Sequence, residues 1–544
     1  MFRFFFLFLF LPVRILYYLW ICIRLFFLRK KSIYELELPV QFETSDKPFF
    51  VRKFQGKEPT NTRLEILDLL KTISESKRIK KLKIFAPPLE WTLSEFFEIR
   101  EVLESIKNKG ILIQIFATEG GVGTLLLFSA ANECFVGKES EFHIVLPSAE
   151  PIFFGNFLKF WGVEVQAFAS GPYKSFAETF TRGDFTKEAR KNLSALIENL
   201  QDKILTALTK GNDNLKTLYY HPILTADMLK SNGVVTDIIS KDKFFDKESN
   251  PLPVNFPYLE RAKREFKLFP KRREQILILS LDGGISGGDY QNKSRESGRI
   301  DAHSLIPTLT SITSDPKIKA VILEISSPGG SAFYSEQIHQ SIVSLKEKKP
   351  VHAYFKDTVA SGGYYLGSAV DHITASPVCI TGSIGAVMVR ANVQKLYKKF
   401  KLNKEAVGFY PFRDLHSEFS PLRKESVQYL QKEIKRIESV FYNRVSEGRK
   451  IPIEEMPKIG MGRVYLPTTE NRIVDKLGGL LDAIEVLKKE LNLTSVKLVE
   501  ELPSYNFKNK IPILGSLGLE LRELESINQI VFKNHFKIQW RNTR

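Results

Sequence analysis

Two stretches of the chain show the same order of apolar runs and amphipathic segments. In the first, apolar runs at 82–85 and 111–116 flank a segment whose apolar positions recur with helical spacing. In the second, runs at 320–325 and 351–355 do the same. Each pair leads into a glycine-containing turn and a further helical pattern. Strands that alternate with helices predict right-handed crossovers and a mostly parallel sheet in each half.

The two stretches are related as a repeat. Residues 79–134 align without a gap on residues 318–373, at a constant offset of 239 positions. The identity between the copies is low, but the shared order of elements favours duplication. Each copy is followed by a longer helical pattern, near 186–210 and near 421–446.

The amino-terminal segment is apolar and basic. Its two apolar runs, at 4–13 and 15–23, are separated by an arginine, and a basic cluster at 29–31 closes it. It has no acidic residue, and no small-residue cleavage site follows, which disfavours a cleaved signal peptide. We therefore expect an uncleaved membrane anchor at 1–31. An amphipathic helix that lies in the membrane plane is the alternative.

Length and composition indicate several globular domains. The chain has 544 residues, of which 43% are hydrophobic and 26% charged, so wholesale disorder is excluded. Three scattered cysteines exclude a disulfide framework. After the anchor we predict an N-terminal α/β unit at 45–265 and a C-terminal α/β unit at 275–490. An extension of unknown role follows at 495–544. The Pro- and Lys-rich stretch at 251–273 is predicted to be the linker between the two units.

The second copy carries residues suited to nucleophilic catalysis. Gly329 and Gly330 follow the strand at 320–325, and without a Cβ they can turn backbone N–H groups toward a developing oxyanion. Ser361 lies in the turn after the next strand, where it would begin a helix with little steric cover. A serine in such a turn is more often a helix cap or turn residue, so the residues alone leave both roles open.

The first copy carries a lysine instead. Val122 aligns with Ser361, and the positions that align with the two glycines are not glycine. Ser175 and Glu178 have the spacing of a capping box, which would place Lys174 just before a helix N-terminus. The helix dipole and burial would both favour the neutral amine, which can act as a general base. A solvated surface lysine is the alternative. The complementary losses in the two copies nevertheless predict one site that both copies share.

Several ordered motifs carry a family resemblance. They are SPGGS at 327–331, ASGGY at 360–364, TGSIG at 381–385 and YKS at 173–175. Together they resemble the long, tandem-domain form of the protease IV type of signal peptide peptidase. The resemblance covers about 50–490. It implies an α/β fold with two tandem crotonase/Clp-protease-like units related by duplication, preceded by an N-terminal membrane anchor.

The resemblance also implies the roles of individual residues. Ser361 would be the nucleophile and Lys174 the general base of a Ser–Lys serine protease. The backbone N–H groups at Gly329 and Gly330 would form the oxyanion hole, and Ser383 would orient the lysine. No metal or cofactor is implied.

Partners and location follow only from the resemblance. It implies hydrophobic peptide substrates such as cleaved signal peptides, contact with membrane lipid, and a homo-oligomer, a tetramer. The expected location is the bacterial inner membrane, with the catalytic part on the periplasmic face. The net charge of +17 does not indicate nucleic acid as a partner, because the lysines alternate with acids on helical faces. A catalytically inactive scaffold and a crotonase-type acyl-CoA enzyme are the alternatives.

Overall fold

The chain divides into two compact units. The computed structural model describes residues 11–43, 62–209, 220–246, 250–267, 274–287, 298–493 and 496–501. Unit 1 contains the described residues up to Leu146 and those from Gln201 to Glu274. Unit 2 contains Pro147–Leu200 and the described residues from Gln275 onward. Helix α9 (Lys187–Thr209) carries the chain from the second unit back into the first.

Unit 1 is built on a parallel sheet whose five strands follow the order β1-β2-β3-β5-β9. The strands are β1 (Ile33–Glu37), β2 (Lys81–Ala86), β3 (Leu112–Ala117), β5 (Glu133–Val136) and β9 (Asp237–Ile238). The central strands β2 and β3 are almost entirely buried, as expected of parallel strands covered by helices. The apolar runs at 82–85 and 111–116 are therefore confirmed as strands.

Two helices of unit 1 begin with a capping box. Thr62 and Glu65 form a capping box at the start of α4 (Arg63–Ser74). Thr92 and Glu95 form a second one at the start of α5 (Leu93–Asn108). The other helices are α2 (Leu11–Phe27), α6 (Val122–Ala130), α11 (Ala226–Ser231), α12 (Lys241–Phe244) and α13 (Phe256–Arg264). A small second sheet contains β4 (Gly120–Gly121), β6 (Glu141–His143) and β8 (Ile223–Thr225).

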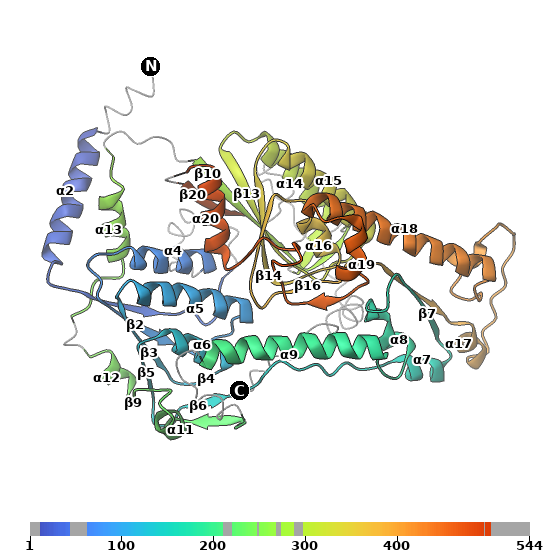
Figure 1. Cartoon of the computed structure of the whole chain (residues 1–544), viewed down its shortest axis with the longest axis horizontal. Helices are drawn as coiled ribbons and strands as arrows, with labels where there is room; N and C mark the ends of the chain where they lie inside the picture. The colour runs from blue at the N-terminus through green and yellow to red at the C-terminus, as the bar shows by residue number, and fades with distance from the viewer. Residues whose placement is uncertain are drawn as a thin grey trace, which may run out of the picture. The chain divides into compact units, whose positions relative to one another are not determined.

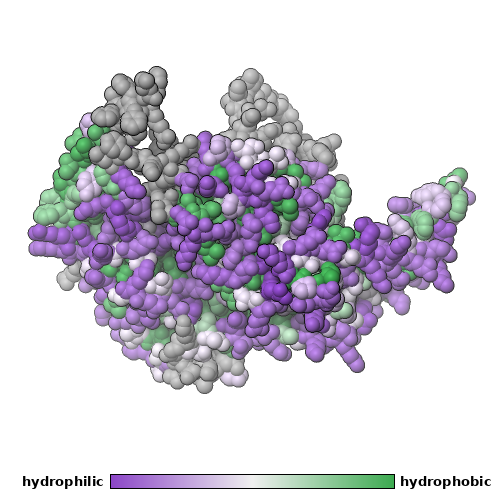
Figure 2. All heavy atoms as spheres, turned by 45° about the horizontal axis from the view of Figure 1, so that its top comes forward, coloured by the Kyte–Doolittle hydropathy of each residue, from purple (hydrophilic) through white to green (hydrophobic). Residues whose placement is uncertain are grey.

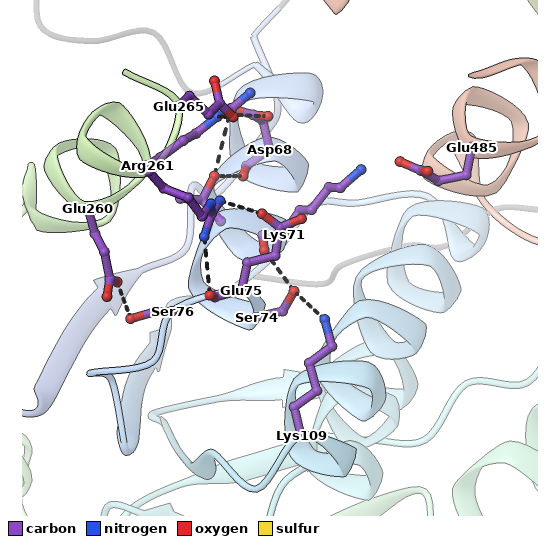
Figure 3. Close-up of polar contacts among 12 residues, drawn as sticks. Asp68, Lys71, Ser74, Glu75, Ser76, Lys109, Glu260, Arg261, Glu265 and Glu485 are labelled. Atoms are coloured by element: carbon purple, nitrogen blue, oxygen red, sulfur yellow. Dashed lines mark hydrogen bonds and ion pairs between the residues drawn. The ribbon is translucent and has the colours of Figure 1, made fainter. Parts of the chain in front are cut away.

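Helix α13 lies inside the stretch predicted to be a linker, so that prediction is wrong for its central part. Phe256 is fully buried, and Arg261 binds Asp68 of α4 with an N–O distance of 2.8 Å (Figure 3). Arg264 binds Glu75, the residue that directly follows α4, at 2.5 Å. The helix was missed because its basic residues resemble a solvated linker. Its proline, moreover, occupies the first turn, where proline does not interrupt a helix.

Unit 2 contains an eight-stranded, mostly parallel sheet. Its main path is β18-β16-β14-β13-β10-β20, with β15 beside β14 and β19 beside β15. The long strand β14 pairs with β15 along its first half and with β16 along its second half. The strands are β10 (Glu274–Asp282), β13 (Ile318–Ser327), β14 (Val351–Ala360), β15 (His372–Ala375), β16 (Ile380–Gly382), β18 (Val464–Tyr465), β19 (Lys476–Leu477) and β20 (Val496–Glu501).

The helices of unit 2 include α14 (Ala302–Ser314), α15 (Ala332–Lys346), α16 (Gly362–Gly367), α18 (Lys424–Arg449) and α20 (Leu480–Glu490) (Figure 1). Shorter ones are α7 (Gly155–Trp161), α8 (Glu178–Thr181), α17 (Gln394–Lys399) and α19 (Met456–Ile459). The predicted long helical stretches thus correspond to α9 and α18. Apolar side chains of the strands and of α14, α15 and α16 form one continuous core.

The predicted repeat is confirmed element by element. The same offset that aligns the sequences places β2 on β13, α5 on α15, β3 on β14, α6 on α16 and β5 on β15. Each half therefore contains the same strand–helix–strand–helix–strand unit, and the chain is a tandem of two α/β units.

The division between the units differs from the predicted one. The prediction placed the lysine segment in an N-terminal unit at 45–265, whereas 147–200 belongs to unit 2 together with the serine. The cause is β7 (Glu164–Ala169), which pairs antiparallel with β17 (Val387–Asn392). Such a long-range pairing leaves no signal in the local pattern of either segment.

The two ends of the chain are only partly described. Residues 1–10 and 502–544 lie outside the described residues, so most of the predicted 495–544 extension does as well. Within the extension, β20 continues the sheet of unit 2 next to β10. No helix in the described part of the chain combines the length and the hydropathy needed to cross a membrane.

Candidate active site

The predicted site residues of unit 2 gather at one edge of its sheet. Gly329 follows β13, Ser361 follows β14, and Ser383 follows β16. These three strands are parallel neighbours, so their carboxyl ends lie at the same edge. In open α/β sheets this edge is where ligands bind.

Ser361 occupies a strained turn between β14 and helix α16. Its backbone has φ 52° and ψ −122°, a region that non-glycine residues rarely adopt. The Ser361 N–H donates to the Gly382 carbonyl at 2.9 Å, which holds the turn in place. Its carbonyl accepts the first hydrogen bond of the helix, from Tyr365 N–H. The serine therefore begins a helix, as predicted.

The pairing of β7 with β17 brings the lysine segment to this edge. Just beyond the paired strands, Ser170 N–H donates to the Ala386 carbonyl at 2.9 Å, and Ala386 N–H donates back to Ser170 Oγ at 2.9 Å. Four residues later, Lys174 Nζ lies 3.0 Å from Ser361 Oγ. It also lies 2.8 Å from Ser383 Oγ and 2.6 Å from the Ser383 carbonyl oxygen.

Burial determines the protonation of this lysine. Lys174 is 8% exposed, and burial lowers its pKa from the ordinary value of 10.5 to about 7. A neutral amine has two N–H donors and one lone pair. The Ser383 carbonyl and hydroxyl oxygens can accept the two N–H groups. The lone pair is then left to accept the hydroxyl proton of Ser361.

The predicted capping box at the lysine is not formed, so this part of the prediction is wrong. Ser175 begins a short 3₁₀ turn without a side-chain cap. The Glu178 carboxylate instead accepts hydrogen bonds from the N–H and the hydroxyl of Thr186, at 2.9 and 2.7 Å. The lowered pKa of Lys174 therefore comes from burial rather than from the end of a regular helix.

The glycine turn packs directly against the serine. A Cβ on Gly329 would lie 2.8 Å from the Cβ of Ser361 and 2.6 Å from the Gly362 nitrogen, so only glycine fits there. The Gly329 N–H donates to Ser327 Oγ at 3.2 Å. Gly330 forms a parallel β-bridge with Ile285. The residues on either side of Gly330, and not Gly330 itself, make the hydrogen bonds to Ile285. In such a bridge the N–H of the central residue points away from the partner strand.

Sequence reasoning missed one backbone donor at the site. Gly362 is the first residue of α16, and the first N–H groups of a helix have no intrahelical acceptor. It follows Ser361 directly, so its N–H is available beside the nucleophile. This donor could have been found from the sequence, because the residue that directly follows a helix-starting serine has an N–H without an acceptor inside the helix.

A second missed feature is the segment Gly460–Arg463. A Cβ on Gly462 would lie 2.5 Å from the Lys174 nitrogen and 2.6 Å from its Cα, so the two backbones are in direct contact. The Met461 carbonyl accepts from Tyr173 N–H at 3.2 Å. Gly462 also has φ 80°, which favours glycine. The two glycines around Met461 were the available sequence signal.

Arg463 connects the lysine loop to the strand that precedes Ser383. Its carbonyl accepts from Ser383 N–H at 2.5 Å. Its guanidinium lies 4.4 Å from the centre of the Tyr173 ring and donates to the Tyr173 hydroxyl at 3.2 Å. Arg463 thus contacts both Ser383, which binds the Lys174 amine, and Tyr173, which precedes Lys174 in the chain.

Two relatives match most of the chain. The chloroplastic serine protease SPPA of Arabidopsis thaliana is 28% identical over 458 residues, which cover 81% of this chain and 68% of that protein. Protease 4 of Haemophilus influenzae is 26% identical over 417 residues, covering 72% of this chain and 66% of that protein. The chain therefore spans about two thirds of the length of these curated relatives.

A solved structure matches more weakly. A point mutant of ClpP1 from Listeria monocytogenes is 15% identical with a TM-score of 0.25, covering 39% of this chain and 94% of that one. A score this low supports no conclusion about the fold, so the expected likeness to crotonase and Clp-protease folds stays a prediction.

The family assignment rests on both halves of the repeat. The model of peptidase family S49 matches residues 112–245 and 344–494, just over half of the chain. These segments include β3 and α6 of unit 1, Lys174, and the Ser361 and Ser383 turns. The chain therefore belongs to peptidase family S49 and is a serine protease.

Proposed function

We propose that the protein cleaves peptide bonds with a dyad of Ser361 and Lys174. The observation that carries this proposal is the 3.0 Å distance between Lys174 Nζ and Ser361 Oγ at a lysine that is 8% exposed. A lysine with its pKa near 7 is partly neutral at neutral pH and can accept a proton. Ser383 orients the amine through its two oxygen atoms.

In the first step Lys174 Nζ takes the hydroxyl proton as Ser361 Oγ attacks the scissile carbonyl carbon. Collapse of the tetrahedral intermediate breaks the C–N bond, and the lysine donates its proton to the leaving amine. The acyl group stays on Ser361 Oγ. Water, deprotonated by the neutral lysine, then attacks the ester, and the proton returns to the serine oxygen.

Backbone donors around the serine would hold the oxyanion. The Gly330 N–H points away from its bridge partner, and the Gly362 N–H lies directly after the nucleophile. Because the Gly329 N–H already donates to Ser327 Oγ, we assign Gly329 a packing role beside Ser361. Loss of one oxyanion donor typically costs about 10²–10³-fold in kcat.

We propose hydrophobic peptides, such as cleaved signal peptides, as substrates, and the resemblance to signal peptide peptidases supports this. Attachment to membrane lipid through residues 1–31 would place the enzyme near such peptides. The location would be the bacterial inner membrane, with the catalytic part on the periplasmic face. The apolar and acid-free composition of this segment supports attachment to lipid.

We also propose a homo-oligomer, a tetramer by resemblance. Support comes from a stretch of unit 2 between α17 and α18 that exposes large apolar side chains. Val407 is 95% exposed, Phe409 80% and Phe400 61%. Clusters of this kind commonly mark protein–protein contacts. Light scattering of the purified protein would test the number of subunits, and a monomer at micromolar concentration would contradict the proposal.

The substrate proposal is tested with two fluorogenic peptides of equal length, one apolar and one polar. We expect the apolar peptide to be cleaved at least tenfold faster in kcat/KM. The Ser361→Ala variant should cleave neither, while Ser344→Ala, which alters an exposed serine on α15, should match the wild type. Equal rates on both peptides would contradict the substrate class. Hydrolysis by Ser361→Ala would contradict the dyad.

A further inference from the structure

Helix α2 packs one of its sides against unit 1. Ile21 is fully buried and Leu25 is 4% exposed. The Tyr18 ring stacks on Phe266 with ring centres 4.4 Å apart. In Figure 1, α2 lies beside α13, which it contacts. The side of α2 that carries these residues therefore packs as part of unit 1.

Polar contacts fix the helix at both ends. Arg14 donates to the Lys267 carbonyl at 2.7 Å, near the start of α2. Arg78 donates to the Leu25 carbonyl at 2.6 Å, near its end. Just beyond the helix, Lys31 Nζ donates to the Pro251 carbonyl at 3.1 Å. These contacts hold the whole length of the described helix along unit 1.

The outward side of α2 is apolar and aromatic. Figure 2 shows a hydrophobic strip on this helix at the left edge of the molecule. It consists of exposed side chains that share this face: Leu16 (66%), Leu19 (49%), Trp20 (43%), Ile23 (57%), Phe26 (56%) and Phe27 (76%). A contiguous exposed surface of this kind indicates a partner.

Charge identifies the partner. The guanidinium of Arg24 lies 5.5 Å from the Trp20 ring centre, and that of Arg29 lies 4.5 Å from the Phe26 ring centre. The first 31 residues contain no acid. Aromatic side chains next to arginines, without acids, fit the interface of an anionic lipid bilayer.

The neighbours of α2 determine its orientation. Arg261 of α13 forms an ion pair with Asp68 of α4, which Figure 3 shows, and Arg264 forms one with Glu75 directly after α4. A helix that crossed the bilayer while packed on α13 would carry these ion pairs to hydrocarbon depth. Charged side chains at that depth are strongly disfavoured. Docked in the membrane plane, α2 keeps them on the water side.

We propose that the outward side of α2 docks on an anionic lipid surface with the helix axis parallel to the membrane. This proposal rests on the membrane attachment proposed above and specifies its geometry. Unit 1 then remains in water, held against the bilayer by the same helix that completes its fold.

Depth measurements at two positions on α2 test the orientation. Leu16→Cys and Phe27→Cys are made in a Cys22→Ala background, since the other two cysteines are buried, and each is labelled with an environment-sensitive fluorophore. The full-length protein is mixed with vesicles of phosphatidylcholine and phosphatidylglycerol that carry quenchers at known depths. The two positions are eleven residues apart, about 16 Å along a helix. We expect equal, shallow depths, and depths that differ by about 16 Å would overturn the proposal.

Two controls separate lipid docking from other contacts. A label at Ile223, an exposed residue of β8 outside α2, should not respond to vesicles. Arg24→Gln should weaken vesicle binding roughly 5-fold, whereas Lys203→Gln, an exposed lysine on α9, should not. A change in emission without vesicles that grows with protein concentration would identify a second copy of the chain as the partner and overturn the proposal.

Peptidase activity is scored separately, on a soluble peptide in detergent. Loss of that activity in the labelled variants, with equal depths at both positions, would still support the docking of α2. Normal activity with unequal depths would overturn the docking and leave the dyad standing. The two proposals can therefore fail independently.

Discussion

The pKa of Lys174 should set the pH dependence of peptide hydrolysis. Lowering the pKa from 10.5 to about 7 corresponds to a preference for the neutral amine on the order of 5 kcal/mol. About half of the enzyme then carries the neutral base at pH 7. With an ordinary lysine pKa, only about one molecule in 3,000 would. We therefore expect kcat/KM to rise with pH, to pass its midpoint near pH 7 and to level off above it.

Lowering the pH from 8 to 5 tests this expectation. About 1% of a base with this pKa is neutral at pH 5, so kcat/KM should fall roughly 100-fold. The assay uses a soluble fluorogenic peptide between pH 5 and 10, and each sample is returned to pH 8 to show that activity recovers. The same burial makes the free energy of unfolding rise between about pH 7 and 10.5. In that range the unfolded chain binds the extra proton.

Two results would show that the burial of Lys174 does not set the pH dependence. A rate that keeps rising tenfold per pH unit to pH 9 or above would mean that Lys174 has an ordinary pKa and is reached by water. A rate independent of pH between 5 and 8 would mean that another group accepts the proton. Either outcome would remove the connection between burial and catalysis.

Three further predictions follow from the packing around the site. Gly462→Ala should reduce kcat/KM on the order of 100-fold by displacing the Lys174 backbone. Gly408 has a similar φ of 87° and open space around it, so Gly408→Ala should leave kcat/KM unchanged. Equal losses of kcat/KM in both variants would contradict this explanation. Arg463→Gln should open the lysine loop to water and move the pH midpoint upward, and an unchanged midpoint would show that Arg463 does not keep the site dry. Burial lowers the pKa of His339 to about 4, so the free energy of unfolding should fall between pH 6.5 and 4, by up to roughly 3 kcal/mol. The melting temperature of His339→Leu should fall less on acidification than that of the wild type. An identical fall in both would show that His339 does not cause the acid dependence.

The repeat and its strands could be predicted because they depend on local pattern. Buried parallel strands appear as continuous apolar runs, and the offset of the two copies carried through to α5 and α15 without a shift. Helix α13 could not be predicted, since its buried side is narrow and three of its nine residues are basic. The unit boundary failed for a different reason, the long-range pairing of β7 with β17.

The site could be predicted in part. Glycine turns and a strand-to-helix serine have local signatures, and the structure brings Ser361, Ser383 and Lys174 within hydrogen-bond distance. The capping-box spacing at Ser175 was misleading, because Thr186 offered Glu178 better donors. The contacts of Gly462 with the lysine join segments almost 300 residues apart, and one sequence does not show which segments meet.

Labelling of the nucleophile tests the central claim most directly. The full-length protein is treated with a fluorophosphonate probe at pH 8, and its intact mass is measured for the wild type, Ser361→Ala and Lys174→Ala. Exposed residues of unit 2 serve as matched controls, in Ser344→Ala and Lys432→Ala. We expect one adduct on the wild type and on both controls, and none on either dyad variant. An adduct on Ser361→Ala, or undiminished labelling of Lys174→Ala, would contradict it.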